Sequence, residues 1–128
     1  DDEGNAAFLK AAAGALKPGA RFALETGGAL ESLVPNYQER RWYQIGDILF
    51  LVANQYDPLG GRLDTEYTFI RGGQTDRRLG SQRVYSCSEL CGMFRAAGLA
   101  DVAAFGSVGG EPFKVGSPRL ILTAARAV

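Results

Sequence analysis

The 128-residue chain contains no histidine and only two cysteines. The missing histidine excludes Ser-His-Asp and Cys-His nucleophile pairs, histidine zinc sites and histidine general bases. Two cysteines cannot form a disulfide framework or a four-cysteine metal site, so Cys87 and Cys91 are expected to be reduced thiols. The glycine patterns of dinucleotide-binding and P-loop proteins are also missing. The residues alone therefore give no recognisable catalytic constellation.

The chain also lacks an excess of charge and a long apolar run. Fourteen basic residues balance fourteen acidic ones, whereas nucleic-acid or anionic-membrane binders usually carry a basic excess. No apolar run reaches the roughly 20 residues of a membrane span, and no signal peptide is visible. We therefore expect a soluble chain without nucleic-acid or membrane partners, and the reduced thiols indicate a cytoplasmic location. Because Asp1 opens directly into a helical pattern, we expect the chain to begin within a fold or to have been trimmed.

A hydrophobic content of 46% is sufficient for one domain or domain fragment over residues 1–128. Helical spacing predicts a helix over 3–16, and Pro18 ends it. A short apolar strand is predicted over 21–26. This order of helix, tight turn and strand is typical of a layered α/β fold. The predicted apolar face of the helix consists of Phe8, Ala11, Ala12, Ala15 and Leu16.

Residues 40–85 have a different pattern, in which helical spacing disappears. Turn-forming residues at 46–47, 57–61 and 72–73 separate four segments of strand-like composition. Apolar and polar side chains alternate through the third segment, as in a half-buried strand. The region therefore predicts a four-stranded antiparallel meander, whose last strand covers 76–85.

The α/β pattern returns in the last third of the chain. Ser86 and Glu89 have the spacing of a capping box, which predicts a helix over 87–97 with Gly98 as its left-handed C-terminal residue. Strands are predicted at 102–105 and 120–124. The last of these is continuously apolar, as in a strand buried on both faces.

Four side chains are candidates for binding a ligand. Arg83 and Tyr85 are predicted to share one strand face and point into a cleft; alternatively, Tyr85 is a hydrophobic staple and Arg83 pairs with a neighbour such as Glu66. Tyr37 and Trp42, with Tyr43, line an aromatic pocket or form ordinary core.

Cys87 and Cys91 lie four residues apart on the predicted helix. They are either a redox pair or soft metal ligands, or two half-buried thiols without a chemical role. The second interpretation is favoured because the rigid helix strains a bridge between such positions.

Three passages of the sequence resemble class I S-adenosylmethionine-dependent methyltransferases. Residues 1–9 and 16–22 resemble a passage of these enzymes in which a helix is followed by the motif L-[KR]-P-G-G-R and then by a strand. Ala20 stands in place of the second glycine of that motif. Residues 83–99 resemble the later R-x-Y-[ST]-x-x-E-L…A-G-F passage, with Leu99 in place of phenylalanine. Residues 117–124 resemble the closing strand of these enzymes.

The resemblance implies an α/β fold equivalent to the C-terminal half of a Rossmann-like methyltransferase. That half comprises the last three strands and two helices, the final strand antiparallel to the others. The meander at 40–85 would be an insertion that covers the acceptor site. The cofactor-binding loop and the ribose-binding acid of the family belong to the half that is missing.

The function implied is methyl transfer from S-adenosylmethionine to a small organic acceptor, largely by proximity. Tyr37, Trp42, Arg83 and Tyr85 would be the acceptor-binding residues. The isolated chain is expected to be inactive and to bind the cofactor weakly or not at all.

Two other functions remain open from the sequence. The meander could enclose a small ligand in a cavity lined by Tyr43, Phe50 and Tyr67, without catalysis. Alternatively, the chain could be an assembly module, because the strand at 21–26 would present a free edge that favours a homodimer.

Overall fold

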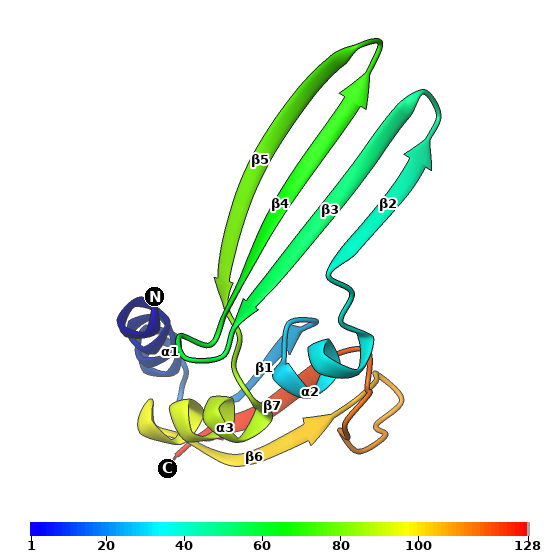
Figure 1. Ribbon diagram of the computed structural model, residues 1–128. Coiled ribbons are helices and arrows are strands. Elements are labelled where there is room, and N and C mark those ends of the chain that lie inside the picture. Colours follow the sequence, from blue (N-terminus) through cyan, green and yellow to red (C-terminus); the bar gives the residue numbers. More distant parts are fainter. Residues whose placement is uncertain (128) are drawn as a thin grey trace. The chain divides into compact units, whose positions relative to one another are not determined.

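The computed structural model describes residues 1–127, which form two compact units (Figure 1). The first unit contains residues 1–36 and the segment from Tyr85 onward, and the second contains Tyr37–Val84. The predicted meander therefore folds as a separate unit inserted into an α/β unit. No helix among the described residues is long and apolar enough to cross a membrane.

The first unit is built on a three-stranded sheet in the order β1-β7-β6. β1 (Arg21–Thr26) and β6 (Leu99–Phe105) flank β7 (Leu120–Arg126), which is antiparallel to both. The predicted strands and the antiparallel direction of the last one are confirmed. β1 lies at an edge of this sheet, as expected, and its pairing with a second copy stays a prediction.

The core of this unit joins the sheet to α3 (Cys87–Ala96). Phe94 and Leu122 are fully buried, and the rings of Phe94 and Phe22 meet edge to face at 5.7 Å. The capping box at Ser86 and Glu89 is present with both of its hydrogen bonds. Gly98 has a φ of 94°, which is the left-handed conformation that its sequence position predicts.

α1 (Asp2–Ala15) forms close to its predicted bounds, but its buried face differs from the prediction. Phe8 is 61% exposed, whereas Leu9 and Ala13 are buried in the core. The prediction was wrong because alanine occupies positions all around this helix, so the apolar pattern has little direction. The packed face is therefore set by tertiary contacts of Leu9.

A short helical segment in the first unit was not predicted. It consists of α2 (Leu30–Leu33) and the 3-10 turn η1 (Val34–Asn36), and it is too short for periodicity to reveal. The carboxylate of Glu31 accepts the backbone N–H of Cys87 at 3.0 and 3.2 Å. Glu31 thus attaches α2 to the N-terminus of α3, where negative charge is favourable.

The second unit is a four-stranded antiparallel sheet in the order β2-β3-β4-β5. Its strands are β2 (Arg40–Ile45), β3 (Ile48–Asp57), β4 (Arg62–Arg71) and β5 (Gln74–Arg83). The predicted meander is confirmed, but its last strand starts and ends two residues earlier than expected. Because β5 ends at Arg83, Tyr85 is not part of this sheet and belongs to the first unit.

Candidate functional site

The register of the second unit separates its side chains onto two faces. Because neighbouring side chains in a strand alternate, Trp42, Leu51 and Thr68 lie on one face, which we call the cavity face. Tyr43, Phe50 and Phe69 lie on the opposite face, which we call the aromatic face. The two faces differ in chemistry.

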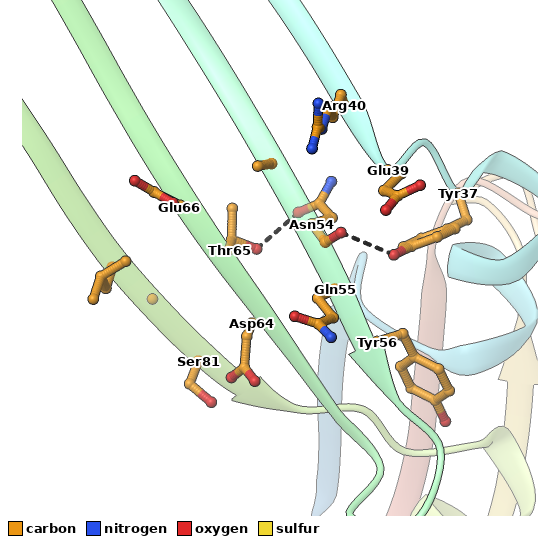
Figure 2. Close-up of a pocket in the computed structure, with 13 residues that line it drawn as sticks. Tyr37, Glu39, Arg40, Asn54, Gln55, Tyr56, Asp64, Thr65, Glu66 and Ser81 are labelled. Carbon is orange, nitrogen blue, oxygen red and sulfur yellow. Dashed lines mark hydrogen bonds between the residues drawn. The ribbon is translucent and has the colours of Figure 1, made fainter.

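A cavity of about 700 Å³ lies over the end of this sheet where β2 begins and β5 ends (Figure 2). It is lined by residues of β2, β3, β4 and β5 and of the segment that precedes β2. The polar residues that line it include Tyr37, Glu39, Arg40, Asn54, Gln55, Asp64, Glu66 and Ser81. Its size is within the range of small-molecule sites.

Hydrogen bonds of Asn54 fix the wall formed by residues 37–39. The Asn54 side-chain amide donates to the Gln38 carbonyl at 3.0 Å, and its backbone N–H donates to the Glu39 carbonyl at 2.7 Å. The Tyr37 hydroxyl donates to the Asn54 carbonyl at 3.0 Å (Figure 2). The buried Thr65 donates its hydroxyl to Asn54 Oδ1 at 2.8 Å. Asn54 therefore positions Tyr37 and Glu39 at the cavity.

Carboxylates outnumber cations in the lining of the cavity. Glu39, Asp64 and Glu66 contribute three carboxylates, and Arg40 contributes one guanidinium. Glu66 pairs with Arg77 at 3.7 Å, whereas Glu39 and Asp64 form no ion pair with any described residue. Carboxylates only accept hydrogen bonds when ionised. The cavity is therefore suited to a ligand that presents hydroxyl or ammonium donors.

A second cavity of about 340 Å³ adjoins the first and shares Arg40, Ala53 and Glu66 with it. Its lining adds the apolar side chains of Trp42 and Leu51. We call the two adjoining cavities the trough; its larger part is lined mostly by polar residues, and its smaller part combines Trp42 and Leu51 with Arg41 and Thr68. Such a trough can orient a ligand that has a polar part and an apolar part.

Two of the four predicted binding residues are brought together in this trough. Tyr37 lines the larger cavity and Trp42 lines the smaller one. Trp42 is 68% exposed, so the alternative that these aromatics are ordinary core is wrong for this residue. Their contact with an acceptor stays a prediction.

Arg83 and Tyr85 are not among the described residues that line either cavity, and they do not share a strand face as expected. The Arg83 guanidinium donates to the carbonyls of Gly61 and Val84. The Tyr85 hydroxyl donates to Asp2 Oδ1 at 2.7 Å and accepts from Asn5 at 2.9 Å. Tyr85 also packs on the core cluster that contains Leu90, as a hydrophobic staple does.

The acidic residues of the cavity were not predicted, although the sequence holds a signal for them. Asp64 and Glu66 alternate along β4 with Leu63, Thr65 and Tyr67. The alternation predicted the strand, but none of its polar residues was named as a binding candidate. Ser81 faces Asp64 across the β4–β5 ladder, a pairing that only the register reveals.

The two cysteines are free and half-buried on α3. Burial raises the pKa of the Cys87 thiol to about 11, with further contributions from Cys91 and from the Glu31 carboxylate. Such a thiol is protonated at neutral pH, and a protonated thiol is a poor nucleophile and a poor metal ligand. This environment favours the interpretation of Cys87 and Cys91 as thiols without a chemical role.

Comparison with known proteins finds no matching family model and no matching curated protein. Solved structures do match. The CcbJ methyltransferase from Streptomyces caelestis aligns with a TM-score of 0.75 and 18% identity over 94% of this chain and 49% of its own. An S-adenosylmethionine-dependent methyltransferase from Clostridium acetobutylicum ATCC 824 aligns with a TM-score of 0.78 and 14% identity over 100% of this chain and 53% of its own.

A third match is CalS10 from Micromonospora echinaspora, described as an amino pentose methyltransferase involved in calicheamicin biosynthesis and solved with bound S-adenosylmethionine. It has a TM-score of 0.62 and 17% identity, and the alignment covers 95% of this chain and 50% of CalS10. The chain thus spans about half the length of the solved structures that it matches. Its fold is that of the C-terminal half of a Rossmann-like methyltransferase, as the sequence resemblance implied. Because the alignments cover at least 94% of the chain, they include the inserted four-stranded sheet.

Proposed function

We propose that this chain is the acceptor-binding half of an S-adenosylmethionine-dependent methyltransferase that acts on a small organic acceptor. The observation that carries the proposal is the carboxylate-lined trough on an inserted sheet that solved methyltransferases share. We further propose an acceptor of the amino-sugar class. CalS10 is described as an amino pentose methyltransferase, and an amino sugar presents the hydroxyl and ammonium donors that the cavity is suited to bind.

In this proposal the described residues orient the acceptor. Glu39 and Asp64 accept hydrogen bonds from its ammonium or hydroxyl groups, and charge-assisted hydrogen bonds of this kind are stronger than neutral ones. The exposed ring of Trp42 contacts the apolar side of the ligand. Holding the acceptor in one orientation is how a site of this type accelerates transfer, since proximity can supply a large part of the rate enhancement.

The cofactor, S-adenosylmethionine, does not fit the residues described. The glycine-rich loop and the ribose-binding acid that the fold uses for the cofactor precede the region that this chain spans. Within residues 1–127, we assign no residue to cofactor binding. Methyl transfer is therefore proposed for a protein that combines both halves, and the four-stranded sheet contributes the acceptor site.

The proposal is tested by calorimetric titration of the chain with glucosamine and, as a matched neutral ligand, glucose. We expect glucosamine to bind more tightly. Asp64→Asn and Glu39→Gln remove charge without changing shape, and each should weaken glucosamine binding about tenfold, which corresponds to roughly 1.4 kcal/mol. Asp47→Asn lies in the β2–β3 turn outside the cavity lining and is the control. Equal affinity of all variants for glucosamine would contradict the proposal.

A further inference from the structure

The trough extends further along the strands than one sugar ring can reach. The register places Asp64 in one row across the cavity face with Gln55 and Ser81. It places Trp42 beside Leu51 in a row four residues further along the strands. Since a strand rises roughly 3.3 Å per residue, the two rows are roughly 13 Å apart. A sugar ring with its substituents spans roughly 6 Å, about four bond lengths. A ligand that contacts both rows is therefore longer than an amino sugar.

The row between these two belongs to both cavities, so the trough is continuous from the acidic row to the tryptophan row. The residues that both cavities share are Arg40, Ala53 and Glu66. The Glu66 carboxylate already pairs with Arg77 at 3.7 Å. Ala53 is exposed and its side chain is only a methyl group, so a ligand can pass over it from one cavity to the other.

The volume of the trough also exceeds that of an amino sugar. Glucosamine has about 12 non-hydrogen atoms, and at the roughly 30 Å³ that a water molecule takes in the liquid it needs at most about 360 Å³. The larger cavity measures about 700 Å³, and the smaller one adds about 340 Å³. The space that remains is sufficient for a second group of similar size.

The side chains at the far row indicate the chemistry of that second group. Trp42 is 68% exposed, and its ring stacks on no other ring of residues 1–127. The half-buried Leu51 lies beside it on β3. An indole ring offers a large apolar surface, and aromatic rings stack on it with a favourable geometry. This end of the trough is therefore suited to an aromatic group rather than to a second sugar.

We propose that the acceptor is a glycoside in which the amino sugar is joined to an aromatic group, and that Trp42 and Leu51 bind this aromatic group. The inference rests on the proposed function, because Glu39 and Asp64 are assigned there to the sugar. It adds a second contact region, which holds the acceptor at both ends and so fixes its orientation along the strands.

The inference is tested by calorimetric titration of the chain with phenyl β-D-glucosaminide and, as the matched ligand without an aromatic ring, methyl β-D-glucosaminide. We expect the phenyl glycoside to bind about tenfold more tightly, because its ring leaves water against Trp42. Trp42→Ala should remove this preference. Tyr43→Ala is the matched control, because it removes an aromatic side chain from the next position of β2, on the aromatic face and outside the lining of both cavities. It should keep the preference.

The fluorescence of the parent chain gives a second measurement that requires no substitution. Trp42 is the single tryptophan, so its emission reports directly on this end of the trough. The phenyl glycoside should shift the emission to shorter wavelength in a saturable manner, with the dissociation constant found by calorimetry. The methyl glycoside should shift it much less.

The outcomes separate this inference from the proposed function. Equal affinity of the parent chain for the two glycosides, with both bound, would overturn the inference and leave the proposed function standing. A preference that persists in Trp42→Ala, or phenyl glycoside binding without a shift in emission, would also overturn it, because the aromatic group would then lie elsewhere. Binding of neither glycoside would overturn the proposed function and this inference with it.

Discussion

Replacing Asn54 by alanine should weaken both the four-stranded sheet and the wall of the candidate site. The substitution removes the bond from the Thr65 hydroxyl at 2.8 Å and the bond to the Gln38 carbonyl at 3.0 Å. Each such bond contributes about 0.5–1.5 kcal/mol, and the buried Thr65 hydroxyl loses its partner. We therefore predict a loss of about 2 kcal/mol in the free energy of unfolding, together with weaker glucosamine binding.

The single tryptophan of the chain makes this loss measurable. Trp42 lies on β2, so its fluorescence reports unfolding of the second unit during titration with urea. Asn36→Ala is the control, because it removes one side-chain hydrogen bond, to Ser32, in the first unit. It should leave the tryptophan transition within about 0.5 kcal/mol of the parent.

A double-mutant cycle with Thr65→Val isolates the bond between Asn54 and Thr65. The two substitutions should be less destabilising together than the sum of their separate effects, because both remove the same bond. A loss below about 0.5 kcal/mol for Asn54→Ala, or strict additivity in the cycle, would refute the role assigned to this residue.

Two further predictions concern the first unit. Phe94→Ala should lower the free energy of unfolding by about 3–5 kcal/mol in a urea titration followed by circular dichroism, because the side chain is fully buried. Phe8→Ala, at an exposed position, should lower it by less than about 0.5 kcal/mol in the same titration. Equal effects of the two substitutions would contradict the packing of α1 and α3. The raised pKa of Cys87 leaves less thiolate at neutral pH. Alkylation of Cys87 by iodoacetamide at pH 7.5 should therefore be about a hundredfold slower in the folded chain than in the unfolded chain. The rate of this alkylation should still rise as the pH approaches 11. An alkylation rate that reaches a plateau below pH 9 would contradict the raised pKa of the Cys87 thiol.

The parts of the fold that the sequence predicted are those with local signals. Turn-forming residues fix the hairpins, as the positive φ of Gly46 and Gly72 shows, and the capping box fixes the start of α3. The Asp57 side chain accepts the backbone N–H groups of Leu59 and Gly60, which stabilises the turn predicted there.

The parts that were missed depend on contacts between distant residues. The exposure of Phe8 follows from how α1 packs, which an alanine-rich pattern does not determine. The place of Tyr85 follows from the end of β5 and from bonds to Asp2 and Asn5, more than 75 residues earlier in the chain. The cavity requires the register that brings Asp64 opposite Ser81. Such a register becomes evident only when all four strands are paired.

The most direct test of the proposed acceptor site is a map of amide chemical shifts of the isotopically labelled chain during titration with glucosamine, followed by S-adenosylhomocysteine. Glucosamine should shift amides that line the cavity, such as those of Ala53, Thr65 and Gly80, in a saturable manner. S-adenosylhomocysteine should produce no saturable shifts. Glucosamine shifts confined to the first unit, or saturable binding of S-adenosylhomocysteine by this chain alone, would contradict the assignment of the chain as an acceptor-binding half.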